Sequence, residues 1–107
     1  MRLIDFLKRP DINEGVRMFR GTKGAVLLDV RTEDEYKRGH IPGSINIPLD
    51  QIMTAQDSLK DKEVSIFTYC LRGSRSQKAV AQLRRMGYTD VTNIGGITAY
   101  KGETTRG

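Results

Sequence analysis

Two largely apolar runs, each followed by polar residues and a helical pattern, constrain the fold of this 107-residue chain more than any other feature. They cover residues 25–30 and 64–69. Runs of this kind are typical of strands buried on both faces of a parallel sheet, whose connections are usually helical. The sequence therefore predicts an α/β fold of three layers, with a mostly parallel central sheet flanked by helices.

Capping signals and apolar spacing predict the helices. These are expected over residues 13–20, 32–37 and 75–86, and helical spacing recurs at Leu49, Ile52 and Met53. Asn13 is the predicted N-cap of the first helix, and Thr32 with Glu35 matches the capping-box pattern of the second. Gly39 and Gly87 follow the second and third helices, where the lack of a Cβ favours a stop.

Two shorter strands complete the expected sheet. They cover residues 44–47 and 91–94. Gly95 and Gly96 are expected to break the chain before a last turn at residues 97–100. Residues 101–107 are mostly polar and are expected to form a frayed tail.

The length of the chain fits one domain over residues 1–107, large enough to bury a core without disulfides or metal. Asp5, Lys8 and Arg9 interrupt the first ten residues before an apolar segment of signal-peptide length can form. No stretch approaches the roughly 20 apolar residues that span a bilayer. With its single, unpaired cysteine, the chain is expected to be a cytoplasmic monomer without membrane association.

The net charge of +5 comes from basic residues spread through the chain. Nucleic-acid binding would need a dense basic stripe with stacking aromatics, and the Phe and Tyr residues form no such pattern. The charge instead favours small anionic substrates. One Cys and one His cannot complete a Cys/His zinc site, so neither a metal nor a cofactor is expected.

Cys70 follows the second apolar run and opens a basic loop at residues 70–75, which leads into the clearest helix. Amides at the start of a helix converge on one point, and the guanidiniums of Arg72 and Arg75 lie nearby in sequence. Such surroundings lower the pKa of a thiol and activate it. The alternative is a small buried cysteine at the end of a core strand. The polar neighbours favour a reactive thiol in an anion-binding loop.

Two separated stretches resemble one family, the rhodanese-like sulfurtransferases, and within it the single-domain members. Residues 28–48 contain the Asp-Val-Arg, Glu-Tyr, Gly-His-Ile-Pro-Gly and Asn-Ile-Pro elements of the family in order. Residues 69–76 match its active-site pattern Tyr-Cys-x-x-Gly-x-Arg-Ser, and residues 95–97 match its late double glycine. Tyr100 stands where these proteins usually carry Trp, a departure that affects packing more than chemistry. The resemblance covers residues 25–101.

The resemblance implies an α/β fold with a central five-stranded sheet and catalysis through a persulfide. The Cys70 thiolate is expected to attack the sulfane sulfur of a donor such as thiosulfate, which releases sulfite. A thiophilic acceptor such as cyanide or a thiol then removes the outer sulfur, which gives the two half-reactions of a covalent mechanism. The chain is therefore expected to be a thiosulfate sulfurtransferase.

Six residues of the loop are predicted to bind substrate: Leu71, Arg72, Gly73, Ser74, Arg75 and Ser76. Their amides would form a cradle for the thiolate or persulfide, and Gly73 permits the sharp turn. Arg72 and Arg75 are candidate ligands of the anionic donor, and a serine hydroxyl adds a hydrogen-bond donor. For Arg75, an ion pair that braces the loop is an equally good interpretation.

Asp29 and Arg31 leave the first strand beside this loop and are predicted to support it. They either orient the loop or, in the favoured interpretation, form a structural pair with Glu35 or another acid. His40 is expected to hydrogen bond within its own turn, because an ionised thiolate needs no general base. Tyr69 is expected to pack in the core.

Alternative functions stay open at this point. Cysteine phosphatases and arsenate reductases use a related loop, but a tetrahedral anion needs more room than the four residues between Cys70 and Arg75 provide. A regulatory rhodanese-like module would bind a protein partner without catalysis, and the intact cysteine loop argues against it. A persulfide carrier would receive sulfur from one protein and deliver it to another, with its basic rim meeting an acidic partner surface.

Overall fold

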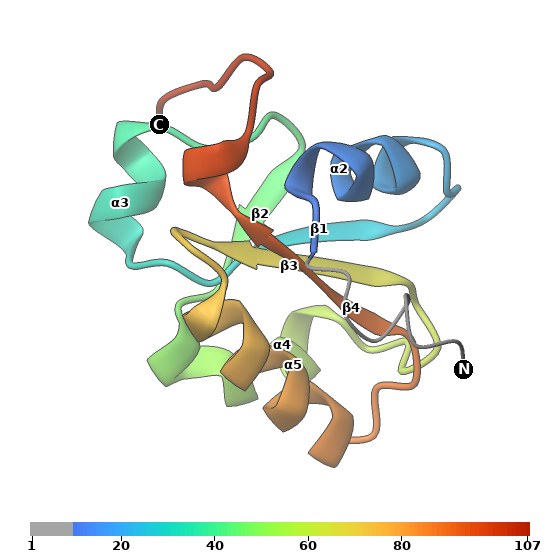
Figure 1. Cartoon of the computed structure of the whole chain (residues 1–107). Helices are drawn as coiled ribbons and strands as arrows, with labels where there is room; N and C mark the ends of the chain where they lie inside the picture. Colours follow the sequence, from blue (N-terminus) through green and yellow to red (C-terminus); the bar gives the residue numbers. More distant parts are fainter. Residues whose placement is uncertain (1–9) are drawn as a thin grey trace.

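The computed structural model describes residues 10–107, which contain a four-stranded parallel sheet. The strands are β1 (Val26–Asp29), β2 (Ser44–Asn46), β3 (Ile66–Cys70) and β4 (Val91–Gly96), in the spatial order β2-β1-β3-β4. The helices are α2 (Ile12–Arg20), α3 (Glu33–Arg38), α4 (Ala55–Ser58) and α5 (Ser74–Arg85), with 3₁₀ helices η1 (Leu49–Thr54) and η2 (Ile97–Ala99). Helix α2 covers one face of the sheet, and α4 and α5 cover the other (Figure 1). The predicted α/β architecture is confirmed.

Side chains of β3 alternate between two cores, one on each face of the sheet. Phe67 and Tyr69 pack with Val16 of α2. Cys70 lies in the other core, with the buried residues of α5. The pleat of β3 thus directs the cysteine toward the helix that follows it.

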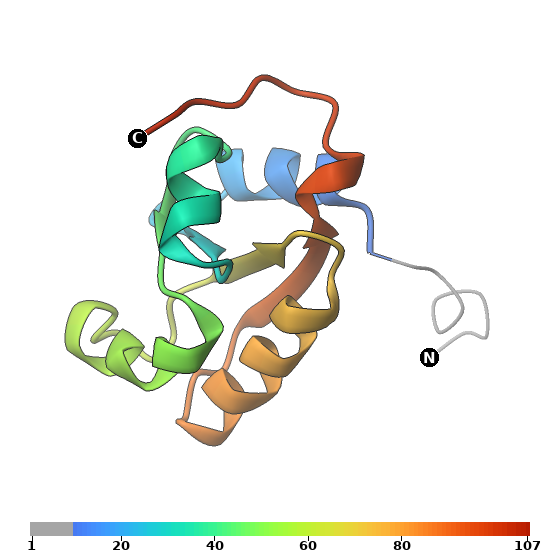
Figure 2. The same cartoon turned by 90° about the vertical axis from the view of Figure 1, so that its left-hand side faces the viewer.

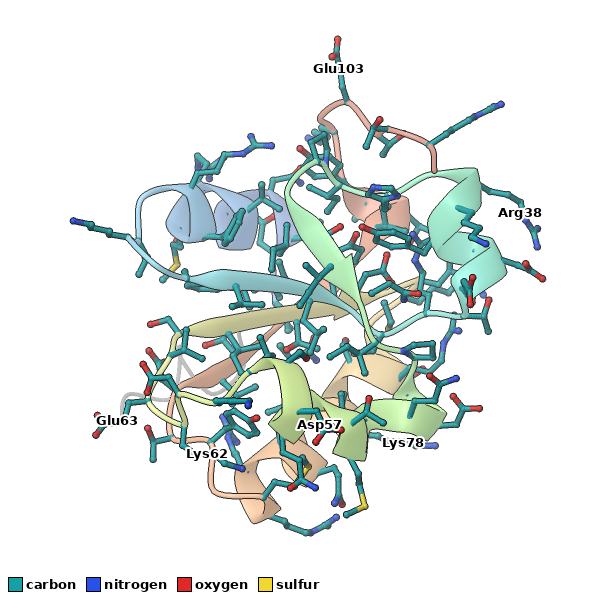
Figure 3. The ribbon with its side chains drawn as sticks, turned by 180° about the vertical axis from the view of Figure 1, so that it is seen from behind. Arg38, Asp57, Lys62, Glu63, Lys78 and Glu103 are labelled. Carbon is teal, nitrogen blue, oxygen red and sulfur yellow. The ribbon has the colours of Figure 1, made fainter. Side chains whose placement is uncertain are left out.

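The core beneath α5 is closed at its far end by Tyr88. The Tyr88 hydroxyl donates to the Leu59 carbonyl at 2.5 Å. The ammonium of Lys62, seen at the surface in Figure 3, lies 4.3 Å from the centre of the Tyr88 ring. Tyr88 is therefore buried at this end of the sheet, and the opposite, carboxyl end carries the predicted site.

The N-cap of α2 is Asp11, so the prediction of Asn13 is wrong. Asp11 Oδ1 accepts a hydrogen bond from the Asn13 amide at 3.0 Å. The Asn13 side chain is used elsewhere, because its Nδ2 donates to the Ala99 carbonyl at 3.0 Å and its Oδ1 accepts from the Lys101 amide at 2.8 Å. These long-range bonds tie α2 to the last residue of η2 and to the segment that follows it.

The other helix signals hold. The capping box of Thr32 and Glu35 is present at α3, and Gly39 follows its last residue. Helix α5 begins at Ser74, one residue earlier than predicted, and Gly87 beyond its end has a φ of 102°. The helical spacing at residues 49–53 corresponds to η1, which runs into α4.

Strand β4 does not break at the double glycine, which corrects the prediction. After a register shift, Gly95 pairs with Tyr69 and Gly96 pairs with Cys70. The loop after β3 crosses Gly96 at close range, where a side chain would not fit, and Gly95 has a left-handed φ of 107° at the register shift. The described residues form four strands, whereas the resemblance implies five.

The C-terminal segment is not frayed, which is a second correction. Thr105 and His40 exchange backbone hydrogen bonds of 2.8 and 2.9 Å, and the Gly107 amide donates to the Lys37 carbonyl at 2.9 Å. Figure 2 shows the segment arching from η2 to α3. Backbone pairing thus anchors this exposed, polar segment.

The expectation about an N-terminal apolar segment falls on residues 1–10, of which 1–9 lie outside the described residues. From residue 10 onward, no helix is both long and apolar enough to cross a membrane.

Candidate active site

The predicted active-site loop lies at the carboxyl edge of the sheet, between β3 and α5. Ligands of open α/β sheets bind at this edge. The loop turns sharply because Gly73 has a φ of 105°, a left-handed conformation that other residues rarely adopt. Gly73 is also the N-cap of α5, so free amides of the first helical turn are available at the end of β3. The backbone curls around the Cys70 side chain.

The thiol of Cys70 lies inside this curl, and the residue has no exposed surface. Its Sγ accepts a hydrogen bond from the Gly73 amide at 2.9 Å and lies 3.4 Å from Ser76 Oγ. Burial raises the pKa of the Cys70 thiol, but the Ser76 hydroxyl and the amides of Ser76, Gly73 and Arg72 lower it by more. The resulting pKa lies below its ordinary value, which favours the nucleophilic thiolate.

Ser76 connects Cys70 to β4 through Asn93, a residue that the sequence-based predictions missed. Ser76 is fully buried, and its Oγ lies 2.7 Å from Asn93 Oδ1 and 3.0 Å from the Gly73 carbonyl. Asn93 Nδ2 donates to the same carbonyl at 3.2 Å. The signal in the sequence is positional: Asn93 lies near the carboxyl end of a predicted strand, two residues before the double glycine.

Gly96 lets β4 pass directly beneath the loop. A Cβ at Gly96 would lie 2.2 Å from the Leu71 carbonyl oxygen and 2.4 Å from Arg72 Cα. The Leu71 carbonyl also accepts hydrogen bonds from the amide and the hydroxyl of Thr98, each at 3.2 Å. The loop is therefore held by β4 and by η2 as well as by its own helix.

The two predicted anion ligands occupy different environments. Arg72 is exposed and, with Gly73 and Ser74, lines a hollow of about 390 Å³ beside the loop. Arg75 is half-buried and donates two hydrogen bonds to the carboxylate of Glu35 at the start of α3, at 2.6 and 3.0 Å. The guanidinium of Arg75 therefore forms an ion pair that links α5 to α3.

Replacing Glu35 with glutamine is expected to destabilise the fold in a pH-dependent way. The hydrogen bonds from Arg75 hold the pKa of Glu35 at about 2, below the unfolded value, so the pair stabilises the fold above the unfolded pKa. The loss should be about 1–2 kcal/mol at neutral pH, discounted for partial exposure, and should shrink as the pH falls from about 4.5 toward 2. Urea unfolding across that pH range measures it.

Glu33 provides the matched control for this substitution. Its carboxylate pairs with Lys37 on the surface, where the two side chains are 69% and 60% exposed. Glu33→Gln should leave the free energy of unfolding unchanged within error. A loss in Glu35→Gln that is the same at every pH would contradict the role of the charge.

Asp29 and Arg31 form a buried ion pair with each other at the end of β1. Arg31 Nη2 lies 2.7 Å from Asp29 Oδ2 and also donates to the Gly39 carbonyl at 2.6 Å. Burial lowers the pKa of Arg31, and the bonds to Asp29 raise it by more. The acid that pairs with Arg31 is thus Asp29, whereas Glu35 forms its ion pair with Arg75. The pair stabilises the turn between α3 and β2.

His40 faces its own turn. Its ring stacks on Tyr36 with the ring centres 3.7 Å apart, and its Nδ1 lies 2.8 Å from the Tyr36 carbonyl. Its backbone pairs with Thr105. These contacts agree with a structural role for His40.

The chemistry available at this edge is that of a thiolate among amide donors. Within residues 10–107, no group of three His, Cys, Asp or Glu side chains is arranged to hold a metal ion. Backbone amides face the sulfur, the Ser76 hydroxyl oxygen lies 3.4 Å from it, and Arg72 adds a cation beside the loop. The arrangement can stabilise an anionic sulfur.

Comparison with known proteins places this geometry in context. Residues 13–103 match the Rhodanese-like domain family. Thiosulfate sulfurtransferase PspE of Escherichia coli (strain K12) is 38% identical over 71 residues, which are 65% of this chain and 68% of PspE. Adenylyltransferase and sulfurtransferase uba4 of Ogataea parapolymorpha is 34% identical over 91 residues, 84% of this chain but 23% of that protein. The solved structure of a rhodanese with anions from E. coli has a TM-score of 0.72 and 33% identity, covering 78% of this chain and 99% of that one.

Proposed function

The chain belongs to the rhodanese-like domain family, and from this we propose that it is a sulfurtransferase in which Cys70 carries a sulfane sulfur as a persulfide. The observation that carries the proposal is the position of Cys70 Sγ, 2.9 Å from the Gly73 amide and enclosed by backbone donors. Preorganised amides of this kind stabilise negative charge on sulfur. The fold alone would not establish an activity, so the proposal depends on this site.

In the first half-reaction, the Cys70 thiolate attacks the sulfane sulfur of thiosulfate. The new bond joins Sγ to that sulfur, while the sulfur–sulfur bond of thiosulfate breaks and its electron pair leaves with sulfite. The product is a Cys70 persulfide whose outer sulfur carries the negative charge. The amides of Arg72, Gly73 and Ser76 stabilise the anionic sulfur before and after transfer.

In the second half-reaction, cyanide or a cellular thiol attacks the outer sulfur. The bond between that sulfur and Sγ breaks, and its electron pair returns to Cys70 as the thiolate. Cyanide leaves as thiocyanate, and a thiol leaves as a persulfide. Neither half-reaction requires a general base, so the structural contacts of His40 are compatible with turnover.

The relatives support the substrate class. PspE is named a thiosulfate sulfurtransferase, and the E. coli rhodanese structure is described as containing anions. The exposed Arg72 and the net charge of +5 suit an anionic donor. Because Cys70 is fully buried, donor entry requires the loop to part from its neighbours before attack.

A persulfide carrier that exchanges sulfur with a protein is the second candidate. The relative uba4, named a sulfurtransferase, is much longer than this chain, which spans 23% of its length. The Cys70 chemistry would be unchanged, and a protein donor or acceptor would replace the small molecule. In that case protein persulfide transfer would be fast while thiosulfate turnover stayed slow.

The phosphatase and arsenate reductase alternatives receive less support. A phosphoryl group would need the guanidinium of Arg75 free to face it, and that group is engaged by both oxygens of Glu35. The four residues between Cys70 and Arg75 also leave a small ring. Hydrolysis of an aryl phosphate faster than formation of thiocyanate would overturn the sulfurtransferase proposal.

Steady-state kinetics with thiosulfate and cyanide test the proposed function. Sulfite leaves before the acceptor reacts, so double-reciprocal plots at several cyanide concentrations should be parallel. Intersecting lines would contradict a persulfide intermediate, because they would require both substrates on the protein together.

Replacing Arg72 with alanine is expected to raise the KM for thiosulfate about tenfold, with kcat changed less than about threefold. One charge-assisted hydrogen bond to the donor is worth about 1.4 kcal/mol or more, which corresponds to that factor. Lys78→Ala is the control, because Lys78 lies on exposed α5 surface outside the lining of the hollow (Figure 3). An unchanged KM in Arg72→Ala would remove Arg72 from donor binding.

A further inference from the structure

The side-chain amide of Asn93 has an orientation fixed by two backbone groups of opposite character. One terminal atom lies 3.0 Å from the N–H of Gly95, so it must be the oxygen. The other lies 3.2 Å from the carbonyl of Gly73, so it must be the nitrogen. A flipped amide would oppose donor to donor and acceptor to acceptor. Asn93 Oδ1 therefore faces Ser76 as an acceptor.

A β-bulge brings this oxygen to the loop. Thr68 pairs with Asn93 and Tyr69 pairs with Gly95, so Ile94 is the extra residue in β4. Gly95, at the bulge, has a left-handed φ of 107°, and its amide donates to Asn93 Oδ1 at 3.0 Å. The bulge thus places the Asn93 side chain in contact with Gly73 and Ser76, at the loop that follows Cys70.

Ser76 carries one hydroxyl hydrogen, and several acceptors surround it. Asn93 Oδ1 lies 2.7 Å from Ser76 Oγ, the Gly73 carbonyl 3.0 Å, and Cys70 Sγ 3.4 Å. When the hydrogen points to Asn93, a lone pair of Ser76 accepts the S–H of Cys70. When Cys70 is ionised, Ser76 stabilises it only by turning its hydrogen away from Asn93. The two arrangements exclude each other.

We propose that Asn93 is a positioning residue that competes with Cys70 for the Ser76 hydroxyl hydrogen and so limits ionisation of the cysteine. The shorter contact, to Asn93, stabilises the state in which Cys70 is a thiol. On ionisation the thiol proton leaves to solvent and the Ser76 hydrogen bond moves to sulfur. The consequence for sulfur transfer rests on the proposed function; the hydrogen-bond competition itself does not.

The charged groups near Cys70 stay paired in this scheme. Arg75 of α5 interacts electrostatically with Cys70 and is held by Glu35 of α3. At the end of β1, Asp29 and Arg31 neutralise each other. Substitution of Asn93 by a neutral residue removes none of these contacts. A change in Cys70 ionisation in such a variant is therefore attributed to the Ser76 hydrogen bond and not to the loss of an ion pair.

Alkylation of Cys70 by iodoacetamide as a function of pH tests the proposal, because Cys70 is the only cysteine. Asn93→Ala removes the shorter of the two contacts that compete with sulfur for the Ser76 hydrogen, and leaves the Gly73 carbonyl at 3.0 Å. The midpoint of the pH profile is expected to fall by about 0.5 units, which makes alkylation about threefold faster on the acid side of the midpoint. A midpoint that stays or rises would overturn the proposal, since loss of a simple brace would loosen the amides and disfavour the thiolate.

Two further variants test whether Asn93 affects Cys70 through the Ser76 hydroxyl. In a Ser76→Ala background, Asn93→Ala should produce no further shift of the midpoint, and a full shift there would overturn the competition. Asn93→Asp keeps the shape and the acceptor oxygen while adding negative charge, so its midpoint should rise. A fall or no change in Asn93→Asp would contradict the proposal even if Asn93→Ala did not fold.

Alkylation requires no sulfur donor, so it separates this inference from the proposed function. Failure to form a persulfide would reject sulfur transfer and leave the alkylation shifts as predicted. Absence of the shifts would reject the role of Asn93 and leave persulfide formation intact.

Discussion

Replacing Cys70 with serine is expected to lower thiocyanate formation from thiosulfate and cyanide by at least about 10³-fold, to the uncatalysed level. A serine hydroxyl does not ionise near neutral pH, and its oxygen cannot form the sulfur–sulfur bond that stores the transferred atom. The Gly73 amide and Ser76 would still face the hydroxyl, so the loop should keep its shape. A colorimetric thiocyanate assay measures the loss.

A relocated thiol provides the matched control. Ser74 lies in the same loop but is exposed. The double variant Cys70→Ser, Ser74→Cys restores one thiol to the chain without the enclosing amides, and it should stay inactive. Recovery of turnover in that variant would show that any thiol in the loop suffices. It would contradict the proposal that the amides around Cys70 activate its thiol.

Replacing Gly96 with alanine is expected to destabilise the fold by about 3 kcal/mol or more and to lower turnover about 100-fold in the protein that stays folded. The new Cβ would lie 2.2 Å from the Leu71 carbonyl oxygen and 2.7 Å from the Arg72 amide nitrogen, both backbone atoms of the active-site loop. Either β4 or the loop must move, and the amides around Cys70 move with it. Urea unfolding and thiocyanate formation measure the two effects.

Gly21→Ala is the control for Gly96→Ala. A Cβ at Gly21 would meet its nearest atom, the Arg17 carbonyl oxygen, at 3.5 Å, an ordinary contact. Its φ of −86° suits any residue, so the change in stability should stay within about 0.5 kcal/mol. Similar stabilities for the two variants would show that the close approach of β4 to the loop does not constrain this fold.

The parts of the fold that the sequence predicted well are those governed by local chemistry. The two apolar runs became adjacent central strands, because a strand without alternation must be covered on both faces. The capping box at Thr32 and Glu35 depends on residues three apart and was found from their identities. The position of Cys70 at the carboxyl edge follows from parallel topology.

The predictions that failed depend on contacts between distant segments. Asn13 is a residue type that favours the N-cap position, but its side chain hydrogen bonds with the end of η2 and with Lys101, and Asp11 is the N-cap instead. Gly95 and Gly96 look like a break in isolation. Both remain in β4: the loop passes over Gly96, and Gly95 has a φ of 107° at the register shift. The first outcome depends on a contact between α2 and η2, and the second on strand register; residue identity reveals neither.

In the candidate site, too, features set by local sequence were predicted and features set by long-range contacts were not. The loop from Leu71 to Ser76 was predicted from its own residues, and its substrate-binding role stays a prediction. The acid partner of Arg75 was not predicted, because Glu35 is 40 residues away and was assigned as a candidate partner of Arg31. Asn93 was missed because its use depends on the bulge opposite Thr68. Its position near the carboxyl end of a predicted strand marks Asn93 as a candidate, but the residue type does not reveal which group it contacts.

Intact-mass spectrometry after incubation with thiosulfate tests the central claim most directly. Wild-type protein, freed of excess donor, should gain the mass of one sulfur atom per chain, and cyanide should remove it as thiocyanate. Cys70→Ser should gain nothing under the same treatment. An unmodified wild-type chain, or an equal gain in the Cys70→Ser variant, would contradict a persulfide on Cys70.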